Sequence, residues 1–322
     1  MNNELRIAQG RWVDPENDDM PARRERKPAR KAPVAPLRKQ SYEGNQDVQR
    51  WLQEQAINDG RKPPFAPTFL AGRRDADWIS SSLAHFYEHD LIVDVLQEVK
   101  SGKEATVFCC SADPGTGAEL LAAKVYRPRM FRSLSNDAIY RDGRTLRDEQ
   151  GNVVRGNRRR VPGTNSARGR ALQVESWIGF EYTTHELIYA AGVTTPRPYA
   201  YVGNGVLMAY LGDLEDPAPR LSDIEPEPAE AKAFLSALID DIRRSLSVHR
   251  IHGDLSAYNV LIWAGRPWLI DFAQAVDPRQ SEDAKALLTR DVRRVIQYLR
   301  RFGASADADT LSERIWDEYV RI

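Results

Sequence analysis

The sequence predicts an α+β fold of two lobes, in which a β-rich first lobe precedes a reduced helical second lobe. Short β-prone runs separated by turn residues occur between positions 105 and 211. Beyond Pro219 the apolar residues instead recur at helical spacing. The chain has 322 residues, of which 42% are hydrophobic, so it is long enough to bury a sizeable core. These observations favour one large two-lobed domain with a tail left over.

Two hairpins are expected in the first lobe. Residues 105–110 and 120–126 are β-prone and flank a stretch rich in Gly, Pro and Asp, which favours a turn. Residues 199–202 and 206–211 flank Gly203-Asn204-Gly205, and this pattern is typical of a second hairpin. The first lobe is therefore expected to contain an antiparallel sheet.

Helical periodicity accounts for most of the other elements. One helix is expected over 77–89 and another over 175–191, where Gly192 suits the position after a helix end. A strongly amphipathic helix is expected to begin at Pro228. Two further helices are predicted at about 281–302 and 309–320.

Three segments are expected along the chain. The predicted boundaries are a disordered basic Pro/Arg-rich tail over 1–45, a linker over 46–76 with a short helix at 47–57, and a domain over 77–322. Within the domain, the first lobe covers about 77–211 with a long insertion at 127–174, and the second lobe covers about 212–322.

Positive charge is concentrated in the N-terminal tail and in the insertion, although the formal net charge of the chain is zero. Residues 23–39 carry eight Lys or Arg against one Glu. Each segment is either a solvated stretch or a surface for RNA, such as that of a ribosomal particle, or another polyanion. The insertion carries an arginine cluster made of Arg155, Arg158, Arg159, Arg160, Arg168 and Arg170.

Several classes of protein are disfavoured. No stretch approaches eighteen apolar residues, and the beginning of the sequence lacks a signal-peptide pattern, so no membrane association is expected. The two cysteines, Cys109 and Cys110, are adjacent, and neighbouring strand residues point to opposite faces. Neither a disulfide between them nor a metal site is expected, and a cytoplasmic location is predicted.

The strongest chemical signal is the stretch His252–Asn259 followed by Ile270-Asp271-Phe272. Phosphoryl transfer needs carboxylates that hold Mg²⁺ and a group that orients the nucleophile. Asp254 is the candidate that orients or deprotonates the attacking hydroxyl. Asn259 and Asp271 are the candidate Mg²⁺ ligands, because this ion prefers oxygen ligands. The apolar runs between them predict a hairpin that brings both ligands to one end.

A lysine that contacts phosphates is the next requirement. Lys124 lies in a predicted strand, where an unpaired charge would be costly, and Glu181 in the following helix is its candidate partner. A phosphate loop is expected at Ser101–Val107, which contains one glycine instead of the three of GxGxxG. The Ser101 hydroxyl and Lys103 are therefore expected to replace some backbone contacts to phosphate.

Together these elements resemble the RIO kinases, an atypical serine/threonine protein-kinase family, over about residues 80–302. The resemblance implies a bilobal protein-kinase-like fold that binds ATP with Mg²⁺, or with Mn²⁺ in its place. The absence of a recognisable winged-helix segment favours the first RIO subgroup or a bacterial relative. The matching segments are Ser101–Ala105, Ala122–Tyr126, the Glu181 helix with Ala191-Gly192-Val193, Thr195–Pro198, Met208–Gly212, Pro217-Ala218-Pro219, His252–Asn259 and Ile270-Asp271-Phe272.

The same resemblance assigns roles to further residues. It implies that the adenine lies against Val107, Ala122, Met208 and Leu261, with backbone contacts near Tyr210 and Leu211. It also implies autophosphorylation or ATP hydrolysis, coupled in some members to assembly of an RNA–protein particle. In the ATPase mode, the aspartate that becomes transiently phosphorylated would be Asp271.

Only 51 residues follow Asp271, which leaves little room for both an activation segment and a peptide-binding platform. The position of the arginine in the common His-Arg-Asp motif is occupied by Gly253. A phosphorylated activation loop would therefore lack its usual partner.

Two alternative functions remain. The first is a small-molecule kinase similar to aminoglycoside and choline kinases, which share the HGD and Asp motifs. Those enzymes usually have a larger helical region after the metal-binding aspartate, so the short C-terminal segment argues against this alternative. The second is a nucleotide-binding, RNA-associated factor with little turnover. The presence of Lys124, Glu181, Asp254, Asn259 and Asp271 together argues against an inactive site.

Overall fold

The computed structural model describes residues 62–127 and 167–321, with side chains described from Trp177 onward in the second range. The described residues from Pro67 onward belong to one compact unit. The predicted basic tail, the short helix at 47–57 and four of the six clustered arginines lie outside the described residues. The other two, Arg168 and Arg170, lie in a helix of which only the backbone is described there.

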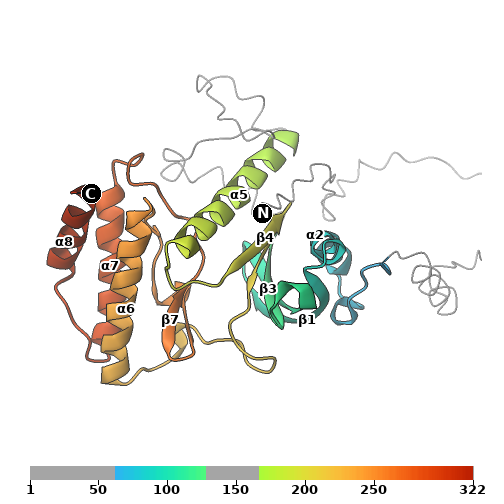
Figure 1. Ribbon diagram of the computed structural model, residues 1–322, viewed down its shortest axis with the longest axis horizontal. Coiled ribbons are helices and arrows are strands. Elements are labelled where there is room, and N and C mark those ends of the chain that lie inside the picture. Colours follow the sequence, from blue (N-terminus) through green and yellow to red (C-terminus); the bar gives the residue numbers. More distant parts are fainter. Residues whose placement is uncertain (1–61, 128–166, 322) are drawn as a thin grey trace, which may run out of the picture. The chain divides into compact units, whose positions relative to one another are not determined.

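The first lobe is built on a five-stranded antiparallel sheet with the order β1-β2-β3-β5-β4 (Figure 1). The two predicted hairpins are confirmed as β2–β3 and β4–β5. The edge strand β1 was not expected from the sequence. The strands are β1 (Ile92–Ser101), β2 (Ala105–Ala112), β3 (Leu120–Tyr126), β4 (Pro198–Val202) and β5 (Gly205–Ala209).

Helices lie against this sheet. Helix α2 (Ala76–Glu88) places Phe86 on Gly205, where a Cβ atom would lie only 2.9 Å from the phenyl ring. Helix α5 (Ala167–Ala190) packs beside β4 (Figure 1). It begins eight residues before the predicted start at 175, inside the range expected to be insertion. Short 3₁₀ turns occur at Thr68–Leu70 and Pro114–Thr116.

The second lobe is mostly helical, and its core is formed by α6, α7 and α8, which lie beside one another in Figure 1. Helix α6 begins at Pro228 as predicted, because Glu227 and Glu230 form a reciprocal capping box and Pro occupies the first turn. The helices are α6 (Pro228–Ser247), α7 (Ala284–Arg300) and α8 (Ala308–Val320).

A small hairpin connects the two segments that carry the predicted catalytic and metal-binding residues. Strands β6 (Val260–Trp263) and β7 (Arg266–Leu269) pair antiparallel, as predicted, and 3₁₀ turns occur at Leu221–Asp223 and Ala257–Asn259. The α+β fold with a sheet-based first lobe and a helical second lobe is therefore confirmed.

Candidate functional site

The ammonium group of Lys124 is the meeting point of three segments. Its Nζ atom lies 2.8 Å from Glu181 Oε1 on α5 and 3.0 Å from Asp271 Oδ1 after β7. The Lys124 and Glu181 side chains are only 13% and 7% exposed. The predicted partner of the strand lysine is therefore confirmed, and the segment of the second lobe that carries Asp271 reaches the same ammonium group.

Opposite charges set the ionisation of this cluster. Burial alone would lower the pKa of Lys124, but the carboxylates of Asp271 and Glu181 outweigh burial and raise it well above its usual value. Desolvation by the surrounding protein opposes ionisation of Asp271, yet the neighbouring Lys124 lowers the pKa of this carboxyl group below its usual value. The geometry therefore favours an ionised lysine beside an ionised aspartate.

Tyr126 is a member of this cluster that the sequence reasoning missed. Its hydroxyl donates a hydrogen bond to Glu181 Oε2, so both oxygens of the Glu181 carboxylate are bound. The ring packs edge-on against Trp177 of α5, with centroids 5.0 Å apart. Burial raises the pKa of Tyr126 well above its usual value, and the adjacent Glu181 adds to the shift. The spacing Lys-x-Tyr on one strand face was the available signal.

Asp254 and Asn259 lie together at the open end of the β6–β7 hairpin. The Asn259 Nδ2 group donates to the Asp254 backbone oxygen at 2.9 Å, which fixes the orientation of the amide and leaves its Oδ1 as a ligand atom. The backbone N–H of Ile270 donates to Asn259 O at 3.1 Å, so the segments before β6 and after β7 are held side by side. Asp271 follows with a left-handed backbone, φ 69°.

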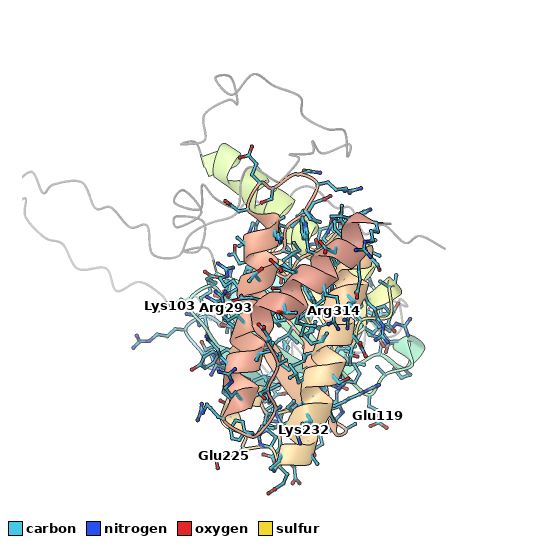
Figure 2. All side chains as sticks on the ribbon, turned by 90° about the vertical axis from the view of Figure 1, so that its left-hand side faces the viewer. Lys103, Glu119, Glu225, Lys232, Arg293 and Arg314 are labelled. Carbon is cyan, nitrogen blue, oxygen red and sulfur yellow. The ribbon has the colours of Figure 1, made fainter. Side chains whose placement is uncertain are left out.

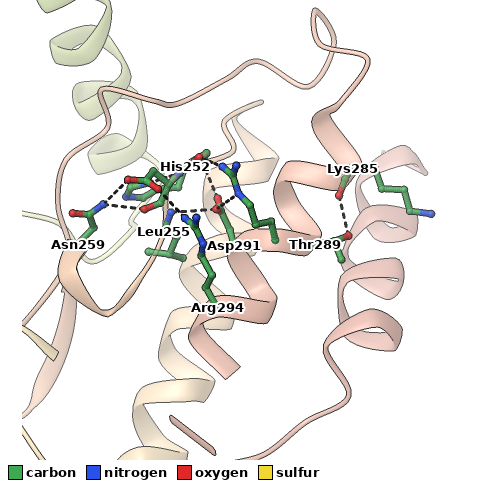
Figure 3. Close-up of polar contacts among 10 residues, drawn as sticks. His252, Leu255, Asn259, Lys285, Thr289, Asp291 and Arg294 are labelled. Carbon is green, nitrogen blue, oxygen red and sulfur yellow. Dashed lines mark hydrogen bonds and ion pairs between the residues drawn. The ribbon is translucent and has the colours of Figure 1, made fainter. Parts of the chain in front are cut away.

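Helix α7 holds the backbone of the loop that carries Asp254. The buried Asp291 carboxylate accepts hydrogen bonds from Gly253 N at 2.7 Å and from Leu255 N at 3.2 Å (Figure 3). The Arg290 guanidinium donates to the Gly253 carbonyl. One turn further along α7, Arg294 Nη1 lies 2.7 Å from Asp254 Oδ1. None of these three α7 residues was predicted to belong to the site, because charged residues on an amphipathic helix usually face solvent.

Gly253 occupies a position that only glycine fits. Its φ is 77°, a left-handed conformation, and a Cβ atom would collide with the carbonyl oxygen of Gln274. The close approach of the Gln274 backbone therefore explains why glycine stands where the common motif has arginine.

Phe272, which follows Asp271 in the chain, packs between two histidine rings. Its ring centroid lies 5.2 Å from that of His185 on α5 and 5.3 Å from that of His252. The His252 Nε2–H group donates to Ile270 O at 3.1 Å, which ties the loop to the end of β7. Burial lowers the pKa of His185 to about 4, so this ring is neutral at ordinary pH. The stack links α5, which carries Glu181, to the segment that carries Asp271.

Several residues predicted to contact nucleotide share one face of the sheet. Val107 pairs with Lys124, and Ala122 pairs with Met208, and directly paired residues point to the same side. Strand residues two positions apart also share a face, so all four point the same way.

The other predicted nucleotide contacts lie in separate elements. Leu261 lies on β6 in the second lobe, and Tyr210 and Leu211 lie in the segment after β5. Ser101 ends β1, and its hydroxyl accepts a hydrogen bond from Arg127. Lys103 is exposed and extends away from the loop (Figure 2).

The donor set suits a cation that nucleotide phosphates also bind. The side chains of Asn259 and Asp271 offer an amide and a carboxylate oxygen, which are ligands that Mg²⁺ prefers. Within residues 62–127 and 167–321, no group of three or more His, Cys, Asp and Glu side chains could hold a metal ion.

Comparison with known sequences gives one consistent result. The profile of the RIO domain matches residues 139–311. A RIO-type serine/threonine-protein kinase Rio1 of Haloferax volcanii is 33% identical over 67% of this chain and 66% of its own length. A Rio1 of Thermoplasma acidophilum is 33% identical over 44% of this chain and 73% of its length. The rio1 kinase of Schizosaccharomyces pombe is 30% identical over 64% of this chain, which spans only 38% of that relative.

Solved structures share the fold. The Rio2 kinase–ADP/Mg²⁺–phosphoaspartate complex from Chaetomium thermophilum matches with a TM-score of 0.52 at 18% identity, over 83% of this chain and 75% of that one. The Rio2 kinase from the same organism matches with a TM-score of 0.51 at 19% identity, over 83% of this chain and 77% of that one. No helix among the described residues is both long and apolar enough to cross a membrane.

Proposed function

This chain belongs to the RIO kinase family, and from that premise we propose that it transfers the γ-phosphate of ATP, with Mg²⁺, to serine or threonine hydroxyl groups. The observation that supports this proposal most is the convergence of Lys124, Glu181 and Asp271 within ion-pair distance. A strand lysine, a helix glutamate and a metal-binding aspartate are the parts that protein kinases use to hold ATP.

Each residue has a separate task in this proposal. Lys124 contacts the phosphates of ATP while Glu181 holds the lysine in place. Asp254 orients the acceptor hydroxyl and accepts its proton as the oxygen forms a bond to phosphorus. Asn259 and Asp271 hold the metal ion, which supplies positive charge to the phosphates when it is bound.

The nucleotide is proposed to lie on the sheet face that carries Val107, Ala122, Met208 and Lys124. These three apolar side chains provide a surface for the adenine, as cofactor sites usually do. Leu261 covers it from the second lobe, and backbone groups near Tyr210 and Leu211 bind the base edge. Ser101 and Lys103 are proposed to contact the phosphates.

Substitution of the two aspartates tests the assignment. Asp254→Asn and Asp271→Asn should each lower ATP-dependent phosphorylation by at least about a hundredfold, because general bases alone contribute on that order. The matched control is Asp283→Asn, an exposed aspartate just before α7. Transfer of labelled phosphate from ATP measures the effect, and full activity in Asp254→Asn would refute its role.

A second proposed activity is ATP hydrolysis through Asp271. The solved Rio2 complex contains a phosphoaspartate. In this route an Asp271 carboxylate oxygen bonds to the γ-phosphorus as ADP leaves, and water then hydrolyses the acyl phosphate. Label on the protein that hydroxylamine removes, and that Asp271→Asn abolishes, supports this route. Label that resists hydroxylamine supports serine or threonine autophosphorylation instead.

The remaining partners and the location are also proposals. The basic tail and the arginine-rich insertion are proposed to contact RNA or a ribosomal particle, on the basis of their charge. A chain that lacks residues 1–45 should then bind RNA more weakly, with a smaller dependence on salt. Equal binding by the full-length and shortened chains would count against the tail. We also propose that the protein is located in the cytoplasm.

A further inference from the structure

The ion pair between Arg294 and Asp254 has no place in the phosphate-transfer steps above. Arg294 Nη1 lies 2.7 Å from Asp254 Oδ1, and the two side chains are 40% and 50% exposed (Figure 3). The carboxylate proposed to accept the hydroxyl proton is therefore paired with a cation that solvent can reach. An acceptor that approaches Asp254 must approach Arg294 as well.

The loop does not depend on this pair for its conformation. Asp291 binds the backbone N–H groups of Gly253 and Leu255, and Arg290 binds the Gly253 carbonyl. The Asn259 amide binds the Asp254 carbonyl at 2.9 Å. Arg294 contacts the side chain of Asp254 instead of the loop backbone, and Asp254 is its ion-pair partner within the part of the chain that the structure describes. Its role therefore concerns the carboxylate itself.

An exposed pair of this kind exchanges partners readily. Exposed ion pairs contribute little to stability, since water solvates both groups. A guanidinium carries five N–H donors in a planar fork that matches carboxylate and phosphate groups. A second anion can therefore bind Arg294 and leave Asp254 Oδ1 to accept a hydrogen bond from a hydroxyl group.

We propose that Arg294 is a specificity-determining residue that selects acceptors with an anionic group beside the reacting serine or threonine. This inference rests on the proposed kinase function. Because the guanidinium and the carboxylate are in direct contact, the anion and the hydroxyl must be neighbours in the acceptor. The anion pairs with Arg294, the hydroxyl proton passes to Asp254, and the hydroxyl oxygen bonds to the γ-phosphorus as the bond to ADP breaks.

Three acceptor peptides test this proposal with the full chain. They differ only in the residue after the reacting serine, which is aspartate, asparagine or phosphoserine. The wild-type chain should have a kcat/KM about tenfold higher for the charged peptides, the size expected of one charge-assisted contact. In Arg294→Gln the ratio of charged to neutral peptide should fall to about one. A general loss of activity in the variant lowers kcat/KM for all three peptides equally, so it does not change the ratio of charged to neutral peptide.

Arg293 provides the matched control. It is the adjacent residue on α7 and is labelled in Figure 2. Its guanidinium pairs with Asp309 at 2.6 Å instead of with the loop that carries Asp254. Arg293→Gln removes the same charge from the same helix and should keep the wild-type ratio. A preference for only the aspartate or only the phosphoserine peptide supports the proposal and identifies the anion.

Several outcomes overturn the inference. Equal kcat/KM for charged and neutral peptides in the wild-type chain does so, as does a preference that persists in Arg294→Gln. If ATP is turned over but no peptide is phosphorylated, the same peptides are compared as inhibitors of that turnover, and equal inhibition by all three overturns it. A wild-type chain that turns over no ATP refutes the proposed function itself, and the inference with it.

Discussion

Two ion-paired carboxylates of the site differ in their surroundings. Glu181 is buried between Lys124 and Tyr126, and both of its oxygens are bound. Asp254 is half-exposed, and its partner Arg294 lies at the surface. A buried pair is expensive to disrupt because the remaining charge is left without water, whereas an exposed pair is not. The difference indicates that the site has a rigid side, which holds the lysine, and an exchangeable side, which is where the proposed acceptor would bind.

Removal of Glu181 should give the largest loss of stability. Glu181→Ala leaves the Tyr126 hydroxyl without its acceptor and the Lys124 ammonium with Asp271 as its remaining carboxylate partner. The loss of this buried partner should lower the free energy of unfolding by about 3–5 kcal/mol. Urea denaturation measures the change. The control is Glu186→Ala, an exposed glutamate on the same helix. Equal losses in both variants would contradict the rigid side of the comparison.

The rigid side also includes the backbone of the loop that carries Asp254. Asp291→Ala leaves the buried N–H groups of Gly253 and Leu255 without an acceptor, so we expect a loss of about 2–4 kcal/mol. Phosphoryl transfer should fall as well, because Asp254 lies between these two residues. The exposed Asp283→Ala serves as the control in the same denaturation experiment. A stable, fully active Asp291→Ala would show that the loop is held by other contacts.

Much of this site could be predicted from the sequence, because its strongest constraints are local. The spacing of Asp254, Asn259 and Asp271 indicated a hairpin with its ligands at one end, and the structure has that hairpin. Lys124 in a strand required a buried partner, and only a few acidic residues on the next helix were suitable. The hairpin could be predicted from the apolar runs in the sequence. The partner of Lys124 could be predicted from the cost of an unpaired buried charge.

The missed features depend on tertiary contacts. Strand β1 lies at the sheet edge, and its partly exposed residues alternate irregularly, with register shifts along its pairing with β2. Asp291 and Arg294 occupy an amphipathic helix where charged residues normally face solvent. Packing between distant segments decides which loop a helix contacts, and this contact cannot be predicted from the local sequence pattern.

Acid should destabilise the folded chain through the buried His185. Burial lowers the pKa of His185 from 6.5 to about 4 in the folded chain. A histidine of this kind takes up a proton on unfolding, so its stabilising effect is complete above pH 6.5 and is lost as the pH falls towards 4. The loss should reach on the order of 3 kcal/mol at pH 4.

His185→Gln tests this origin of acid sensitivity. The variant keeps a side-chain N–H donor for the Pro196 carbonyl, which His185 Nε2 contacts at 2.6 Å, but it cannot be protonated. Its unfolding free energy should depend less on pH between 6.5 and 4, with the carboxylates around it unchanged. His252, which contacts the same Phe272 ring, and Lys124, whose charge also lowers the pKa of His185, remain in both proteins. Identical pH profiles for wild type and variant would show that His185 is not the origin of the acid sensitivity.

The smallest effect is expected on the exchangeable side. Arg294→Ala removes an exposed ion pair that does not hold the loop backbone, so the free energy of unfolding should change by less than about 1 kcal/mol. Arg293→Ala, which breaks the exposed pair with Asp309, should change it by a similar amount. Thermal or urea unfolding of both variants beside Asp291→Ala places the three α7 residues on one scale. If Arg294→Ala lost as much stability as Asp291→Ala, the Arg294–Asp254 pair would belong to the rigid side, and partner exchange at Asp254 would be too costly for an incoming acceptor.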